Sequence, residues 1–177
     1  MSLYSNRRKL DWKKVNNLRT GFGLCVATVF GAGLFPLAPG TMGTLFGLPV
    51  AYWTQSWDWP VRVLFWLLIT CLGTWSAGVL DQSMQTDDNQ NIVIDEFLGI
   101  GIAAWTAGQD LKTWLVAFVL FRFFDAVKPP PIRQIDGWSK KSSSSIGRAF
   151  GVMADDIAAA CVTLIIILIL QKLSILA

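Results

Sequence analysis

Two long apolar segments constrain the fold of this chain more than any other feature. Segment 147–172 contains the run IIILIL, and segment 61–80 has the roughly 20 residues that a helix needs to cross the hydrocarbon core of a bilayer. The chain is 53% hydrophobic and 15% charged, whereas a soluble domain is about 25% charged. These features predict a membrane protein. The alternative is a soluble helical bundle with an unusually apolar core.

The hydrophobic pattern predicts an all-α fold, a multi-pass membrane bundle of about six helices without strands. We expect helices at 20–35, 42–57, 61–80, 90–107, 111–127 and 147–172. Segment 20–35 either spans the bilayer or is re-entrant. The polar stretch 139–147 is a linker or, alternatively, a mobile flap over a site. The length of 177 residues allows one domain, 20–177, after a basic segment, 1–19.

Positive charge is concentrated in two regions. Of the 15 Lys and Arg residues, six precede residue 20 and six lie between 122 and 148. Because positive charge in short loops marks the cytoplasmic side, both regions are expected to face the cytoplasm. No nucleic-acid-binding fold signal accompanies the N-terminal cluster, so we expect no nucleic-acid partner.

An acidic pair lies inside the apolar stretch NIVIDEFLGIGI, as Asp95 and Glu96. In a helix, Gly99 and Ala103 share the face of Asp95, and small residues allow close helix packing in membranes. Asp95 should therefore point into the bundle. A carboxylate at the centre of a membrane helix costs about 2.5–3.5 kcal/mol, which favours a functional group over a silent, hydrogen-bonded interface residue.

A second acidic pair, Asp155 and Asp156, occurs in GVMADDIAAA. Gly151 and Ala159 flank Asp155 at four-residue spacing, which again places small residues beside a carboxylate. We expect this pair near the N-terminus of the last helix, where the helix dipole favours negative charge.

Arg122, Asp125 and Lys128 are spaced three apart in FRFFDAVKPPPI and share one helix face. The pattern fits an intrahelical ladder of ion pairs. It also fits a phosphate site at the cytoplasmic interface, because Arg offers a bidentate fork to phosphate oxygens.

The stretch LFPLAPGTMGTLFG places Thr41, Gly43 and Thr44 at the start of an expected helix. A helix N-terminus that follows a glycine-containing turn can bind anions. No Gly-Lys-Ser/Thr follows, so this is not a P-loop. A simple turn has a similar sequence.

These clusters together indicate metal-assisted phosphate chemistry. The chain has no histidine, and Cys25, Cys71 and Cys161 lie apart without metal-ligand spacing. Clustered carboxylates without His or Cys ligands favour hard cations, above all Mg²⁺. Mg²⁺ with Arg and Lys is typical of phosphoryl transfer.

Four motifs, in this order, carry a family resemblance: PLAPGTMGTLFGLP, IVIDEFLG, FRFFDAVKPPPI and ADDIAA. The set resembles the phosphatidylglycerophosphatase A family of bacterial phospholipid synthesis. The resemblance implies helices around one central helix, a Mg²⁺-dependent site, an inner-membrane location, and hydrolysis of phosphatidylglycerophosphate to phosphatidylglycerol and phosphate. One departure is Ala159, where the family usually has Gly.

We therefore expect Asp95, Glu96, Asp155 and Asp156 to bind one or two Mg²⁺ ions at a cytoplasm-facing site. Asp125 would be a further ligand or the general base. Arg122, Lys128 and the 40–44 turn, with Thr41, Gly43 and Thr44, would bind the phosphate of the phospholipid. Two other classes stay open, a phosphatidyl transferase and a non-enzymatic cation or proton carrier that uses the buried acids as relay groups.

Overall fold

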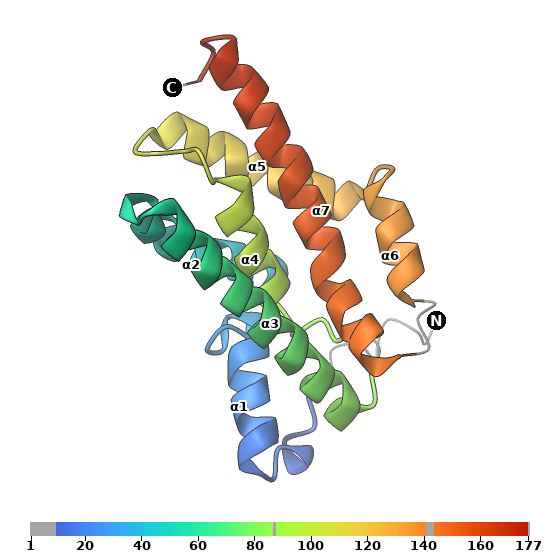
Figure 1. Cartoon of the computed structure of the whole chain (residues 1–177). Helices are drawn as coiled ribbons and strands as arrows, with labels where there is room; N and C mark the ends of the chain where they lie inside the picture. Colours follow the sequence, from blue (N-terminus) through green and yellow to red (C-terminus); the bar gives the residue numbers. More distant parts are fainter. Residues whose placement is uncertain (1–9, 87, 141–143, 177) are drawn as a thin grey trace.

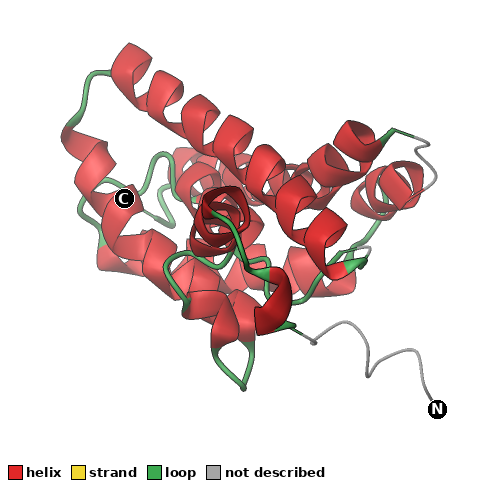
Figure 2. Cartoon of the chain, turned by 90° about the horizontal axis from the view of Figure 1, so that it is seen from below, coloured by secondary structure: helices red, strands yellow, loops and turns green. Residues whose placement is uncertain are grey.

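The computed structural model describes residues 10–86, 88–140 and 144–176, with only the backbone at 138–140 and 145. The described residues form seven α-helices (Figure 1): α1 Leu18–Ala27, α2 Pro39–Trp53, α3 Trp59–Met84, α4 Ile94–Ala103, α5 Leu111–Val127, α6 Ile132–Lys140 and α7 Ser145–Lys172. Short 3-10 turns lie at Trp12–Lys14, Ala32–Leu34 and Thr54–Ser56. Figure 2 shows only helices and loops among the described residues, which confirms the all-α prediction.

Local sequence signals explain where several helices begin. Asn17 forms a capping box with Thr20 at the start of α1, and Asp110 accepts a hydrogen bond from the Thr113 N–H at the start of α5. Ser144 caps α7. Proline occupies the first turn of α2 and of α3, where no N–H partner is lost.

Helix α4 lies in the middle of the bundle and packs against α2, α3, α5 and α7 (Figure 1). Eight of its ten residues are buried. Glycine permits the close contacts: a Cβ at Gly99 would lie 2.2 Å from the Phe121 ring of α5, and one at Gly101 would lie 2.3 Å from the Trp66 ring of α3. The central helix implied by the family resemblance is therefore α4.

Helices α3 and α7 are long and apolar enough to cross a membrane, by length and composition. The mean hydropathy of their most apolar windows is 1.9 and 2.4, and only 33% and 39% of those windows are buried. A core helix of a soluble protein would be mostly buried. The exposed apolar surface of these helices therefore favours a lipid environment over the soluble alternative.

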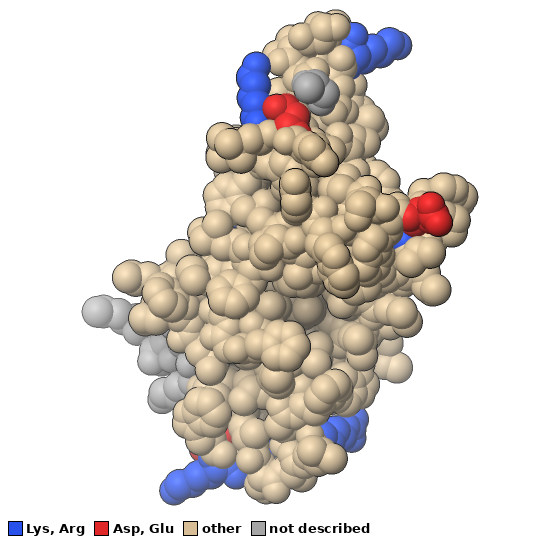
Figure 3. Space-filling view, turned by 90° about the vertical axis from the view of Figure 1, so that its left-hand side faces the viewer, with Lys and Arg blue, Asp and Glu red and all other residues tan. Residues whose placement is uncertain are grey.

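The surface in Figure 3 agrees with this distribution. On that face, charged side chains gather mainly at the two ends of the molecule, and most of the surface between them is uncharged. Large exposed apolar side chains lie on several helices, including Leu64 and Leu68 on α3, Val119 on α5 and Ile169 on α7. Patches of this extent on a monomer mark contact with a membrane or a partner.

Two expected helices are shorter than the sequence pattern predicted. The helix expected at 20–35 ends at Ala27, because Val29, Phe30 and Gly31 adopt left-handed backbone conformations. At ten residues, α1 is about 15 Å long, too short to span a bilayer alone. The helix expected at 90–107 is α4, which begins only at Ile94 because the Val93 N–H bonds to the Ala27 carbonyl.

The polar region after α5 was also predicted incorrectly in part. Residues 132–140 form α6, although the pattern favoured a loop, and 141–143 lie outside the described residues. Helix α7 begins at Ser145, so Asp155 and Asp156 lie about three turns inside it and not near its N-terminus. The expected separation of 1–19 from 20–177 stays a prediction.

Candidate active site

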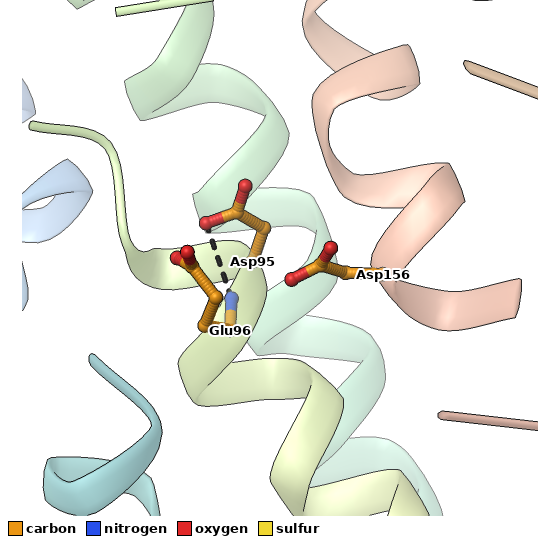
Figure 4. Close-up of side chains that lie close together, drawn as sticks. All are labelled: Asp95, Glu96 and Asp156. Atoms are coloured by element: carbon orange, nitrogen blue, oxygen red, sulfur yellow. Dashed lines mark hydrogen bonds between the residues drawn. The ribbon is translucent and has the colours of Figure 1, made fainter. Parts of the chain in front are cut away.

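Three carboxylates from two helices converge near the middle of the bundle. Asp95 and Glu96 lie in the first turn of α4, and Asp156 reaches them from α7 (Figure 4). One oxygen from each side chain lies within 4.8 Å of the others. An oxygen of Asp95 accepts a hydrogen bond from the Glu96 N–H over 3.1 Å, which fixes the orientation of the Asp95 carboxylate.

We call Asp95, Glu96 and Asp156 the acid cluster. Among the described residues, Oε2 of Glu96 and Oδ2 of Asp156 are buried without a hydrogen-bond donor, as is Oδ1 of the neighbouring Asp155. Buried carboxylates are either protonated or paired with a cation. Oxygen ligands in this number and arrangement fit a hard divalent cation such as Mg²⁺.

Arg122 of α5 lies beside the acid cluster and links two elements. Its Nη1 donates to Oδ2 of Asp125 over 2.6 Å and lies 3.6 Å from Oε1 of Glu96. The Arg122 side chain remains 25% exposed, so it is accessible from the cavity described below. Asp125 also interacts with Asp156, which brings a further carboxylate to the edge of the cluster.

Lys128 provides the second cation of the site. It is the C-terminal cap of α5 in a left-handed conformation, with a φ of 44°, and this turn directs its side chain toward α7. Lys128 donates to Asp155 and lies 3.4 Å from Asp136 of α6. Burial opposes its charge, but the attraction of Asp155 prevails and raises the pKa of Lys128 above the usual 10.5.

The N-terminus of α2 forms another wall of the site. Ala38 precedes it without a side-chain cap, so the first N–H groups of the helix remain available to an anion. A Cβ on Gly40 would lie 2.0 Å from Oε1 of Glu96 and 3.1 Å from Nη2 of Arg122. Only glycine allows this helix end to approach the acid cluster so closely.

The three predicted phosphate-binding residues of this turn have different surroundings. Thr44 is buried and donates its hydroxyl to the Gly40 carbonyl. Gly43 packs against Val93, where a Cβ would lie 2.6 Å from the Val93 carbonyl oxygen. Thr41, in the first turn, is partly buried. The lining of the cavity includes Gly40 and none of these three residues.

A cavity of about 1210 Å³ connects these groups. Its wall includes every predicted catalytic and metal-binding residue and both predicted cations: Asp95, Glu96, Arg122, Asp125, Lys128, Asp155 and Asp156. The four motifs, separated by up to about 120 residues in sequence, therefore meet at one place in the fold.

Comparison with known proteins decides the family. A family model described as phosphatidylglycerophosphatase A matches residues 25–171. The chain belongs to the phosphatidylglycerophosphatase A family. The resemblance found in the sequence is thereby confirmed, as is the expectation that the chain is a phosphatase.

Three relatives cover most of the chain. A phosphatidylglycerophosphatase A of Escherichia coli (strain K12) is 34% identical over 78% of this chain and 77% of its own length. One of Haemophilus influenzae is 34% identical over 82% of this chain and 86% of its own length. A putative phosphatidylinositol-3-phosphatase of Bacteroides thetaiotaomicron is 32% identical over 80% of this chain and 89% of its own length. No solved structure matches the chain.

Sequence reasoning missed several residues that line this candidate site. Gly40 belongs to the 40–44 turn but was given no role of its own, and Asp136 lies in the helix that was expected to be a loop. Asp81 also lines the cavity, where it accepts hydrogen bonds from the Thr86 hydroxyl and from the Asp88 and Asn89 N–H groups. A carboxylate late in an apolar helix was the available signal for Asp81. The neighbouring Asp87 lies outside the described residues.

Proposed function

We propose that this chain hydrolyses phosphatidylglycerophosphate to phosphatidylglycerol and phosphate with the help of Mg²⁺. The observation that carries the proposal is the single cavity in which the acid cluster faces Arg122 and Lys128. Acids for a divalent cation beside two fixed cations match the requirements of phosphate ester hydrolysis. A bare ion carrier has no need for the two cations.

Asp95, Glu96 and Asp156 are the residues that would hold Mg²⁺, with Asp155 as a further ligand once it turns from Lys128. When bound, Mg²⁺ would supply positive charge against the phosphoryl oxygens and make a water molecule a better nucleophile. The unpartnered oxygens of Glu96 and Asp156 support this assignment because a cation would satisfy both.

The side chains around the acid cluster would bind the phosphate and handle the proton. Arg122 and Lys128 would contact the phosphoryl oxygens and stabilise the charge that develops on them. Asp125 orients Arg122 and interacts directly with Asp156, so it is the candidate to accept a proton from a water molecule at the acid cluster. At the start of α2, the backbone N–H of Gly40 would bind the phosphate, because Gly40 lines the cavity. Gly43 packs against Val93, and the Thr44 hydroxyl bonds to its own helix.

We further propose that the chain is a multi-pass protein of the bacterial inner membrane with its site facing the cytoplasm. Arg19 and Arg148 line the same cavity as the acid cluster, and Lys13 and Lys14 precede α1. Lys112 lies in the first turn of α5 and Lys172 in the last turn of α7, at the helix ends opposite to the site. This excess of basic residues at the site end supports a cytoplasmic orientation.

The direct experiment is phosphate release from phosphatidylglycerophosphate by the purified protein in detergent, with Mg²⁺ and with EDTA. We expect release with Mg²⁺, none with EDTA, and recovery when excess Mg²⁺ is restored. Phosphatidylinositol 3-phosphate serves as the second substrate, because one relative is named for it. A preference for that lipid would change the proposed substrate to phosphatidylinositol 3-phosphate. Failure to release phosphate from either lipid with Mg²⁺ present would refute the proposal.

A further inference from the structure

The cavity extends beyond the acid cluster into a groove between α3 and α7. From α3 its wall includes Thr70, Cys71, Thr74 and Trp75, and from α7 it includes Ile146 and Phe150. We call this the α3–α7 groove. The four residues of α3 lie on one face, because positions i, i+1, i+4 and i+5 fall on the same side of a helix.

The α3–α7 groove is apolar, although two of its residues, Thr70 and Thr74, carry hydroxyl groups. The Thr70 hydroxyl donates to the Trp66 carbonyl over 2.8 Å, and the Thr74 hydroxyl donates to the Thr70 carbonyl over 2.9 Å. Both hydroxyls are thus bonded to the backbone of their own helix. The groove therefore offers methyl, thiol and aromatic surface and few hydrogen-bonding groups.

Close contacts between α3 and α7 define the groove, and its outer part stays open. A Cβ on Gly73 would lie 2.6 Å from Cε of Met153, and one on Gly78 would lie 3.2 Å from Cβ of Ala149. Trp75 packs against Phe22 of α1 with ring centroids 5.8 Å apart. Phe150 is 41% exposed and Cys71 is also exposed, so an apolar ligand can enter from the side of the bundle.

We propose that the α3–α7 groove holds an acyl chain of the lipid substrate while the phosphate lies at the acid cluster, an inference that rests on the proposed function. The lining of the same cavity includes both the proposed phosphate-binding cations, Arg122 and Lys128, and the apolar surface of the groove. Its volume of about 1210 Å³ exceeds the roughly 300–1,000 Å³ typical of small-molecule pockets. The groove also opens between the two helices that are long enough to cross the bilayer, where acyl chains are present.

A bulky residue inside the groove tests the proposal, with the same substitution outside it as the control. Cys71→Trp places an indole in the groove, whereas Cys161→Trp places one on an exposed part of α7 outside the cavity lining. Each variant is assayed with long-chain phosphatidylglycerophosphate and with its deacylated, water-soluble headgroup. For Cys71→Trp, the ratio of kcat/KM for the lipid to that for the headgroup should fall about tenfold or more, as for other mismatches in apolar pockets. For Cys161→Trp the ratio should not change.

If Cys71→Trp affects both substrates equally, or does not affect hydrolysis of the lipid, the groove does not hold the acyl chain. Neither result would contradict the proposed phosphatase function. If the wild-type protein hydrolyses neither substrate, the proposed function itself fails. The two failures are therefore distinguishable.

Photocrosslinking gives a readout that does not depend on turnover. A phospholipid with a photoreactive group in its acyl chain is irradiated with the wild-type protein and with Cys71→Trp. We expect labelling of 70–78 and 146–152 that excess unlabelled phosphatidylglycerophosphate displaces and that Cys71→Trp reduces. If neither unlabelled phosphatidylglycerophosphate nor Cys71→Trp reduces the labelling of these segments, the groove is not a specific acyl site.

Discussion

Arg122 on α5 lies 3.6 Å from Glu96 on α4, measured from Nη1 to Oε1, and the N-terminus of α2 closes over this pair at Gly40. Three helices thus meet at one ion pair, and α7 adds the third acid of the cluster. The positions of the charges depend on backbone approach as much as on the charged residues themselves.

Gly40→Ala tests this dependence. The added Cβ would lie 2.0 Å from Oε1 of Glu96, so either the Glu96 carboxylate or α2 must move. Because displacements of about 1 Å at a reacting centre can reduce rates about 100-fold, we expect kcat/KM to fall by that order. Gly137→Ala is the control, since a Cβ there has no neighbour within 4 Å. Full activity of Gly40→Ala would show that the phosphate site lies elsewhere.

Asp95→Asn keeps the shape of the side chain and removes its charge. If Asp95 binds the cation, we expect turnover to fall by about 10²–10⁴-fold while the helical circular dichroism and the melting temperature in detergent stay close to wild type. Asp58→Asn, at an exposed position outside the cavity, is the matched control. Wild-type turnover of Asp95→Asn would remove Asp95 from the mechanism.

Lys128→Met leaves Asp155 buried without its cation. The free energy of unfolding should therefore fall by about 1–3 kcal/mol, and the melting temperature with it. The raised pKa of Lys128 sets the pH dependence: its stabilisation is complete below the unfolded-state value of 10.5 and is lost only as pH rises through the higher folded-state pKa. Asp155, Asp136 and Asp156 are the charges that face it. The difference in melting temperature between the wild type and the variant should therefore be constant from about pH 7 to pH 10.

Lys13→Met is the control for this series, because Lys13 is exposed outside the cavity. A melting temperature of Lys128→Met equal to that of the control, or a stabilisation that disappears between about pH 7 and pH 9, would contradict the assigned ion pairs.

Gly101→Ala tests the packing that holds α4 in place. The added methyl would lie 2.3–2.6 Å from three ring atoms of Trp66, and Trp66 is buried, so the ring has little room to move. We expect a destabilisation of about 1–3 kcal/mol in thermal unfolding. In Gly21→Ala, the new Cβ would lie 4.0 Å from Val15, an ordinary contact, and the variant should be neutral or slightly stabilised. Equal stability of the two variants would contradict the packing around α4.

The sequence was sufficient to place the charged residues of the site but not the helix boundaries around them. Asp95 does point inward on a face shared with Gly99 and Ala103, as the small-residue pattern predicted. The same pattern overestimated the length of its helix by four residues at each end, and before its start the Val93 N–H bonds to the Ala27 carbonyl, 66 positions away in the sequence. Long-range backbone contacts of this kind leave no local signal.

The other differences have similar causes. That Thr44 binds phosphate stays a prediction: its hydroxyl donates to the Gly40 carbonyl, and whether a threonine bonds to its own helix or to a ligand depends on its neighbours. Gly40 matters because of Glu96 on another helix, and glycine has no side chain from which to infer this. The α6 helix contains many polar residues after three prolines, a composition that favours a loop.

Cation binding by the acid cluster is the claim on which the mechanism depends, and titration of the purified, metal-free protein with Mn²⁺, followed by electron paramagnetic resonance, measures it most directly. We predict saturable binding that Mg²⁺ displaces, that Asp156→Asn weakens strongly and that Asp58→Asn leaves unchanged. Absence of saturable binding, or equal binding by wild type and Asp156→Asn, would contradict the account.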